Sequence, residues 1–195
     1  MQINSNDGTN LYGLRYIIRG TTLPNLPSTT GQALYNYHYA TWKSFVMTSG
    51  ILHPGFVFSL AFQPMPYIIP AQSVAAGGNA LAMNPREGDR MWMEYDISWL
   101  TAAGDADADA MARNITESID EYAKTTYAGI KSSHFQEPEN DWEVEYTPIF
   151  MNDAMYDQLP LQSYENNGYE RLKAIQKSVD PEGFFPSRTG GFKFT

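Results

Sequence analysis

Residues 90–100 alternate strictly between two kinds of side chain, and no other pattern in the chain limits its fold so tightly. Successive side chains of a β-strand point to opposite faces of the sheet. One parity holds large apolar residues: Met91, Met93, Tyr95, Ile97 and Trp99. The other parity is mainly polar: Trp92, Glu94, Asp96 and Ser98. The segment is therefore predicted to be a strand of a sheet with one packed face and one wetter face.

Other segments rich in β-branched and aromatic residues extend this predicted sheet. Further strands are expected at 14–18, 40–48, 56–63 and 144–151. The first of these is an edge strand within residues 1–30, which otherwise carry turn and loop residues. A second alternation, at Tyr35, Tyr37 and Tyr39, is also typical of a half-buried strand. Residues 135–143 are charged and are expected to form a loop.

Three helices are predicted around this sheet. The longest begins after Gly104, where acidic residues suit the positive end of a helix dipole. Its apolar residues recur at three- and four-residue steps: Ala108, Met111, Ile115, Ile119 and Tyr122. Shorter helices are expected at 71–76 and 169–178. Because most strands precede the main helix, the predicted fold class is α+β, an antiparallel β-sheet with helices packed on one face.

Composition excludes several classes of protein. The chain has 195 residues, 43% of them hydrophobic, which suits a single domain with a real core. A net charge of −9 disfavours nucleic-acid binding, and no run approaches the ~20 apolar residues of a membrane span. The absence of Cys excludes disulfides and thiolate metal sites. The polar, acidic start is unlike a signal peptide, so the expected compartment is the cytoplasm or unknown.

Candidate chemistry lies on the wetter face of the predicted sheet. Strand parity places six side chains there: Ser59, Gln63, Trp92, Glu94, Asp96 and Ser98. Two carboxylates as close as Glu94 and Asp96 raise one pKa when shielded from water, which suits a general base. The competing interpretation is an ordinary solvated sheet face. Common nucleotide-binding and hydrolase motifs are absent, and the three histidines are not at metal-ligand spacing, so no metal site is predicted.

Several short motifs occur in one order along the chain. Gln63 lies in the first, Asn79 in the second, and Asn152 and Gln158 in the third. They read Phe62-Gln63-Pro64-Met65-Pro66, Gly77-Gly78-Asn79-Ala80-Leu81, and Met151-Asn152-Asp153-Ala154 with Asp157-Gln158. The C-terminal stretch adds Ser163-Tyr164-Glu165, Tyr169–Lys173, Val179–Phe185 and Thr189–Phe194. Together, over roughly residues 40–195, they resemble the end of fungal berberine-bridge-enzyme-like FAD-linked oxidoreductases.

This resemblance implies that residues 1–195 are one substrate-binding-type domain, with residues 166–195 as a terminal helix and tail. It implies an open sheet face directed toward a flavin ring. Residues carried over as lying near flavin or substrate are Gln63, Asn79, Asn152, Gln158 and Tyr164. The family's flavin-binding half has no counterpart here, and neither do its GGHS-like loop and covalent FAD attachment residues. The expected cofactor is therefore none in this chain, or FAD supplied by a partner.

Three functions remain open at this stage. The first is a flavin-independent, redox-neutral cyclase, isomerase or dehydratase acting on a secondary metabolite. Glu94 or Asp96 would be its base, and Gln63, Asn152 and Tyr164 its hydrogen-bond donors. The second is the substrate-binding half of a split FAD-dependent oxidoreductase that needs a separate FAD-binding chain. Under either hypothesis a homodimer would cover an exposed apolar face. The third is a pseudoenzyme without a small-molecule role.

Overall fold

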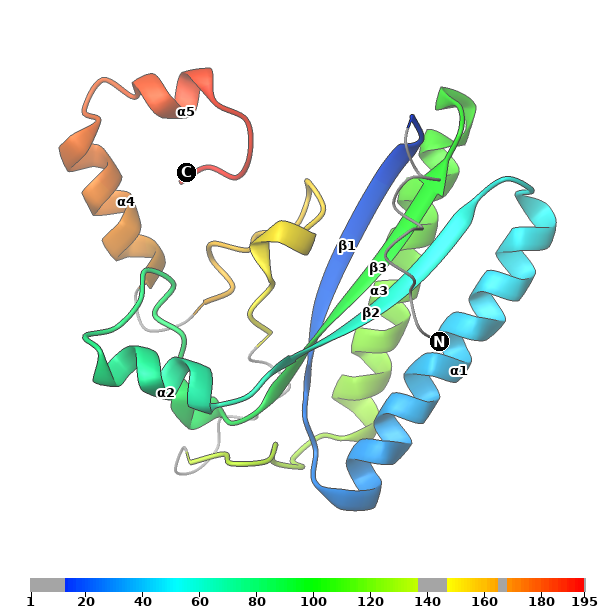
Figure 1. Cartoon of the computed structure of the whole chain (residues 1–195), viewed down its shortest axis with the longest axis horizontal. Helices are drawn as coiled ribbons and strands as arrows, with labels where there is room; N and C mark the ends of the chain where they lie inside the picture. The colour runs from blue at the N-terminus through cyan, green and yellow to red at the C-terminus, as the bar shows by residue number, and fades with distance from the viewer. Residues whose placement is uncertain (1–12, 137–146, 165–167, 195) are drawn as a thin grey trace.

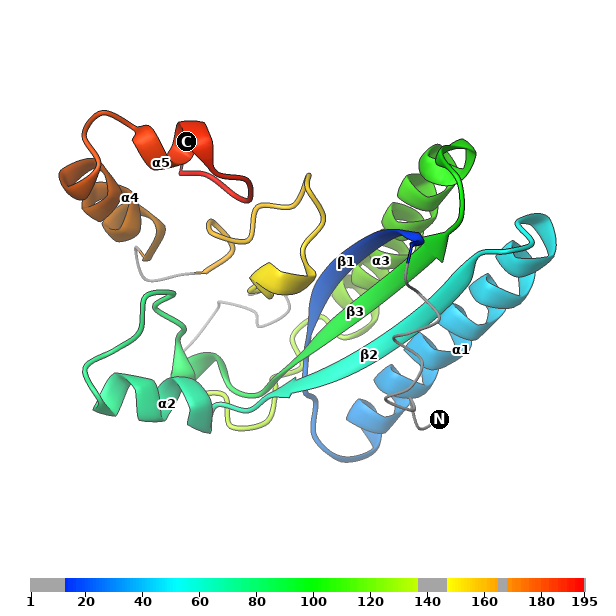
Figure 2. The same cartoon turned by 45° about the horizontal axis from the view of Figure 1, so that its top comes forward.

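The computed structural model describes residues 13–136, 147–164 and 168–194. Three antiparallel strands form one sheet in the order β1-β3-β2, so β3 is the central strand. The strands are β1 (Arg15–Pro24), β2 (Val57–Met65) and β3 (Arg90–Trp99). Figures 1 and 2 show two long helices on one face of this sheet. The other face, turned toward the viewer, has no helix of the described residues packed on it, and we call it the open face. The α+β class and the one-sided helical cover are thus confirmed.

The alternation in the central strand predicted its two faces. Its apolar parity is buried in the two core clusters of the molecule: Met93, Tyr95, Ile97 and Trp99. From the edge strand β2, Phe58 and Leu60 pack against the same clusters. Because the register pairs Ser59 with Asp96 and Ala61 with Glu94, the polar parity of β3 meets the polar parity of β2 on the open face.

The two long helices α1 (Ser28–Leu52) and α3 (Asp105–Thr126) cover the apolar face. In α3 the expected stripe faces the core: Ile119 and Ala108 are fully enclosed, and Tyr122 at its end is partly buried. Asp105 and Asp107 lie in its first turn, as the dipole argument requires. Within the described ranges, no helix combines the length and apolar character needed to cross a bilayer.

The strand predicted at 40–48 is wrong, because these residues belong to α1. So is the strand-like interpretation of the alternating tyrosines Tyr35, Tyr37 and Tyr39. Four core-facing positions recur at helical spacing: Leu34, His38, Trp42 and Phe45. The pattern was hidden because α1 also exposes large apolar side chains such as Met47 and Ile51, so its helical stripe is not framed by polar residues.

Two further expectations need correction. The edge strand at 14–18 extends to Pro24, because ten residues of β1 pair with β3. Residues 15–24 are therefore strand, where mostly turn and loop were predicted. No strand occurs at 147–151; instead Met151–Asp153 forms a short 3-10 turn, η4. Residues 144–146, and 137–143 of the expected charged loop, lie outside the described residues.

A 3-10 turn, η3 (Ala102–Gly104), leads from β3 into α3. Four other elements lie beyond the end of the sheet at which β2 stops (Figure 1). They are α2 (Ile68–Ala75), the 3-10 turn η2 (Pro85–Glu87), α4 (Gly168–Val179) and α5 (Phe184–Arg188). The helices predicted at 71–76 and 169–178 match α2 and α4. In α4 the chain leaves helical geometry before Asp180-Pro181, as expected for residues that cannot continue a helix cheaply. Between these parts, residues 147–163 run beside β1.

Candidate functional site

Three carboxylates meet on the open face of the sheet. Glu94 and Asp96 come from the central strand, and Asp153 comes from η4. The side-chain amide of Gln63, on β2, joins two of them. Its Nε2 donates to Glu94 Oε2 at 2.9 Å and to Asp153 Oδ2 at 2.8 Å. We call Glu94, Asp96, Asp153 and Gln63 the carboxylate cluster.

A glycine on β1 lets η4 approach the sheet. Gly20 lies opposite Glu94 in the β1–β3 register. A Cβ atom at this position would lie 2.8 Å from the backbone oxygen of Asp153. The amide of Gln158 then ties the segment to the strand edge, donating to the Gly20 oxygen at 2.7 Å and accepting from the Gly20 nitrogen at 3.3 Å. Sequence motifs placed Gln158 near substrate, but its observed contacts are with this backbone.

Asp96 is the most deeply buried member of the pair on β3, with 8% of its surface exposed. The Ser59 hydroxyl donates to its Oδ2 at 2.7 Å. Its Oδ1 is buried and has no hydrogen-bond partner of normal geometry among the described residues. Burying a carboxylate oxygen without such a partner costs folding free energy, because no hydrogen bond replaces its lost hydration.

Burial and mutual repulsion perturb the acidity of the cluster. The pKa of Glu94 is raised to about 7, first by burial and then by the negative charges of Asp96 and Asp153, while the Gln63 amide opposes this rise. Burial also raises the pKa of Asp96 and that of Asp153. Interacting carboxyl groups titrate as a unit. The cluster therefore exchanges a proton near neutral pH, where a general acid or base works best.

Two aromatic side chains and one hydroxyl complete this face. The Trp92 indole donates from Nε1 to the Pro148 oxygen at 2.7 Å and stacks on Phe150 at a centroid distance of 4.5 Å. Trp92 thus lies at one end of the open face, between its register partners Thr22 on β1 and Gln63 on β2. Ser98 is buried on the same face.

Other residues from the motifs lie apart from the carboxylate cluster. The buried Tyr164 donates from its hydroxyl to the Ile149 oxygen at 3.0 Å, which holds the segment beside β1. Asn152 is exposed on η4. Asn79 follows α2, where its Nδ2 donates to Ser73 Oγ at 2.7 Å and its backbone oxygen accepts from Arg171 at 3.0 Å.

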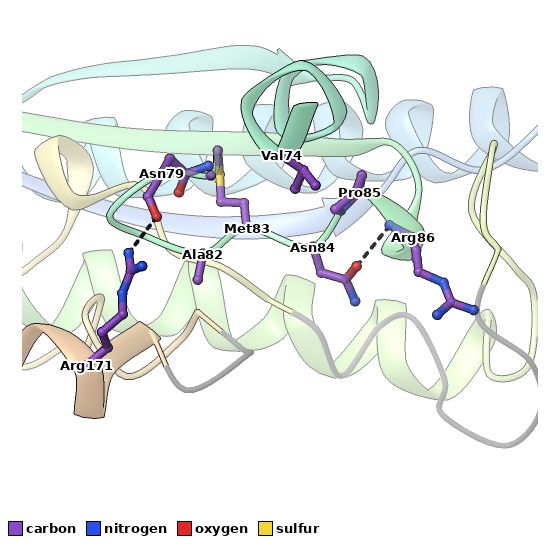
Figure 3. A pocket seen from close by; sticks show the side chains of 9 residues that line it. Val74, Asn79, Ala82, Met83, Asn84, Pro85, Arg86 and Arg171 are labelled. Carbon is purple, nitrogen blue, oxygen red and sulfur yellow. Dashed lines mark hydrogen bonds between the residues drawn. The ribbon is translucent and has the colours of Figure 1, made fainter. Parts of the chain in front are cut away.

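Figure 3 shows the cavity that Asn79 lines, of about 370 Å³, between α2, η2 and α4. Arg86 and Arg171 bring two positive charges to its rim. The structure thus separates the predicted residues into two places. Gln63, Glu94, Asp96 and Ser59 come together on the sheet, whereas Asn79 belongs to this second cavity.

Asp153 and Gly20 are the members of the site that sequence reasoning missed. Asp153 stood beside Asn152 in a quoted motif, yet only the fold brings η4 over the sheet. Gly20 had no visible role, because a glycine in an expected loop needs no explanation. Over the described part of the chain, no three His, Cys, Asp or Glu side chains are arranged to hold a metal ion.

Gly20→Ala is expected to push η4 away from the sheet. The added methyl group would clash with the backbone oxygen of Asp153, which cannot rotate away as the end of a side chain could. We expect a loss of about 2 kcal/mol in unfolding free energy. The pKa of Glu94 should also fall, since Asp153 no longer repels its negative charge. Thermal unfolding and a carboxyl ¹³C NMR titration measure both effects. Gly190→Ala, which adds the same methyl in open space, is the control; a Glu94 pKa equal in both variants would contradict the contact.

The fold and the cluster define an α+β chain with three neighbouring carboxylates on the sheet face opposite the two long helices. Its sequence is similar to fungal FAD-linked oxidoreductases and FAD-dependent monooxygenases. An uncharacterized FAD-linked oxidoreductase of Arthroderma benhamiae is 27% identical over 192 residues, covering 97% of this chain and 36% of the relative. An FAD-dependent monooxygenase of Emericella nidulans is 30% identical over 132 residues, covering 67% of this chain and 24% of the relative. A bifunctional solanapyrone synthase of Alternaria solani is 26% identical over 136 residues, covering 69% of this chain and 23% of the relative.

The chain therefore spans about a quarter to a third of the length of these curated relatives. No family model matches it. No solved structure matches it either. The similarity to FAD-linked oxidoreductases that the motifs suggested is thus supported, while the assignment to a berberine-bridge-type substrate domain stays a prediction.

Proposed function

We propose that this chain is the substrate-binding and proton-transfer part of an FAD-linked oxidoreductase that acts on a small secondary metabolite. The observation that carries the proposal is the meeting of Glu94 and Asp153 at the Gln63 amide on this sheet face, at 2.9 and 2.8 Å. Burial and the neighbouring carboxylates raise the pKa of Glu94 there to about 7. Such a group is ionised enough to accept a proton at neutral pH and basic enough to hold it. The similarity to longer FAD-linked enzymes supports this assignment.

Glu94 acts in this proposal as the general base. It removes a proton from a substrate O–H or C–H group placed on the open face. The Gln63 amide orients the carboxylate through its bond to Oε2. Asp96 and Asp153 raise the basicity of Glu94 by their charge, and they are themselves positioned by Ser59 and Gln63. General-base catalysis of this kind contributes about 10² to 10⁴ in rate.

The open face does not suit the whole of FAD. Three carboxylates lie on it, and the two arginines of β1, Arg15 and Arg19, fall on the opposite parity, toward the helices. A diphosphate needs cations or converging backbone N–H groups, and it would be repelled here. We therefore propose that FAD is held by protein outside residues 1–195.

The visible absorption spectrum of the pure chain, before and after addition of FAD, tests this division. The expected result is a colourless protein whose presence leaves the spectrum of free FAD unchanged. A yellow protein, or a flavin band shifted and retained after gel filtration, would overturn the assignment of FAD binding to another part.

A second candidate is a redox-neutral cyclase, isomerase or dehydratase that uses the same base. One observation favours it: the carboxylate cluster is assembled entirely from this chain, so proton transfer needs no second component. One relative is also named a synthase. Conversion of a metabolite to an isomer by the flavin-free chain would select this function, whereas conversion only with an added FAD-binding chain would select the first.

A further inference from the structure

Residues 148–158 cross the outer edge of β1, and we call this segment the strap. Figure 1 shows it in yellow beside β1. β1 is an edge strand, so the backbone groups on its outer side have no neighbouring strand to pair with. The strap replaces part of that pairing, because the Gln158 side chain bonds to both the nitrogen and the oxygen of Gly20.

The strap places side chains on both sides of the sheet. Asp153 lies on the open face, where the Gln63 amide donates to its Oδ2 at 2.8 Å. Two positions later, Met155 is buried among the apolar residues that β3 and α3 contribute to the core. The backbone therefore passes round the edge of β1 just after Asp153. How firmly the following residues are held then decides where Asp153 lies.

Asp157 holds the strap on the helix side of the sheet through two arginines. Arg19, from β1, donates from Nη1 to Oδ1 of this carboxylate at 2.6 Å. Arg113, from α3, donates from Nη1 to Oδ2. Only 12% of the Arg19 side chain and 24% of the Asp157 side chain are exposed, so solvent screens this pair less than a pair on an open surface. One carboxylate thus joins the strap, β1 and α3.

Both arginines are oriented by further bonds to α3. Arg19 donates from Nε to Thr116 Oγ1 at 2.8 Å. Arg113 donates from Nε to Asp109 Oδ2 at 2.8 Å. Because these guanidinium groups are already held in place, little side-chain entropy is lost when the carboxylate of the strap binds them. Charge-assisted bonds to such groups are among the stronger hydrogen bonds in proteins.

We infer that Asp157 is a positioning residue, which holds the strap so that Asp153 stays beside the Gln63 amide. The inference rests on the proposed function, in which Glu94 acts as the base within the carboxylate cluster. Asp157 lies four positions after Asp153 and acts through the backbone of the strap. Without its carboxylate, the strap leaves the edge of β1 more often, and Asp153 leaves the cluster with it.

Backbone amide hydrogen exchange of the full chain, without substrate, tests the inference. In Asp157→Asn the amides of Asp153 and Met155 are expected to exchange at least about tenfold faster. Both amides are hydrogen-bonded within the strap, at 3.0 and 2.9 Å, so their exchange reports its opening. The NMR signal of the Gln63 side-chain amide should also shift, because its bond to Asp153 is made less often.

Two control variants separate this role from charge and from general stability. Asp107→Asn removes the same charge from an exposed position on α3 and should change neither readout. Gly31→Ala lowers stability through α1, where the added methyl meets the Leu26 backbone, and should leave the strap amides within about twofold of normal. Arg113→Gln removes one of the two bonds to Asp157 and should give a smaller change in the same direction, which keeps the test usable if Asp157→Asn does not fold.

Equal exchange rates and an unmoved Gln63 signal in Asp157→Asn and the unchanged chain would overturn the inference. So would equal acceleration in Asp157→Asn and Gly31→Ala, because Asp157 would then contribute only to general stability. Neither readout needs turnover. Faster exchange in the strap together with full activity of Glu94→Gln would therefore reject the proposed function and leave the hold of Asp157 on Asp153 standing.

Discussion

Replacing Glu94 with glutamine is expected to lower kcat/KM of the complete enzyme by about 10²- to 10⁴-fold, the usual contribution of a general base. Glutamine keeps the size of the side chain and a hydrogen-bond partner for Gln63 but cannot accept the substrate proton. Glu121→Gln is the control, since Glu121 is exposed on α3 away from the open face. A Glu94→Gln enzyme within a few-fold of normal activity would remove Glu94 from the mechanism.

The pH profile gives this prediction a second readout. The base must be ionised, so activity should rise with pH up to about pH 7, the pKa of Glu94. This limb should be absent from the residual activity of Glu94→Gln. A profile that is flat between about pH 5 and about pH 8 in the unchanged enzyme would contradict the role of this carboxyl group.

The same carboxyl group affects stability with a defined sign. Its folded-state pKa of about 7 lies above the ordinary value of 4.5, so the folded chain binds more protons between these values. Stability is thus highest below about pH 4.5 for this group and is lost as pH rises to about 7. After discounting for solvent screening, the change is about 1 kcal/mol. Glu94→Gln should show a smaller loss over this range.

Gly31→Ala is expected to cause the largest loss of stability among single methyl additions. Gly31 is buried in the first turn of α1, and a Cβ there would lie 2.1 Å from the backbone oxygen of Leu26. Leu26 is itself enclosed in the core, so the backbone has little room to yield. We expect a loss of about 2–3 kcal/mol and a fall in unfolding temperature of roughly 5–10 °C, measured by circular dichroism.

Gly50→Ala in the same helix is the matched control. A Cβ at Gly50 meets nothing within 4 Å. Alanine has the better helix propensity, so this variant should gain about 0.5–1 kcal/mol. If both variants changed stability in the same direction, the close approach of Leu26 to α1 would be contradicted.

Part of the site could be predicted from the sequence because of the geometry of β-strands. Side-chain direction in a strand repeats every two residues, so parity alone placed Ser59, Gln63, Glu94 and Asp96 on one face. All four then proved to be hydrogen-bonded, in two pairs: Ser59 with Asp96, and Gln63 with Glu94. Asp153 lay outside this logic, because no local period links an irregular segment to a strand about sixty residues earlier.

The helix α1 could not be predicted from periodicity in the sequence. Periodicity predicts a helix only when one face is apolar and the other polar. α1 satisfies the first condition through Leu34 and Trp42 but violates the second by exposing Met47 and Ile51. Local composition then favoured a strand. These residues are helical because α1 packs against the sheet and α3. Such contacts cannot be seen in a short window of sequence.

By itself, the sequence determined the central strand, its two faces, the amphipathic α3 and the α+β class, because each depends on a local repeat of side-chain character. Only the tertiary structure decided that β1 runs to Pro24, that Gly20 admits η4, and that Asp153 joins the carboxylate cluster. These contacts join residues that are far apart along the chain. Their energies come from burial and charge at close range, which arise only when the chain has folded.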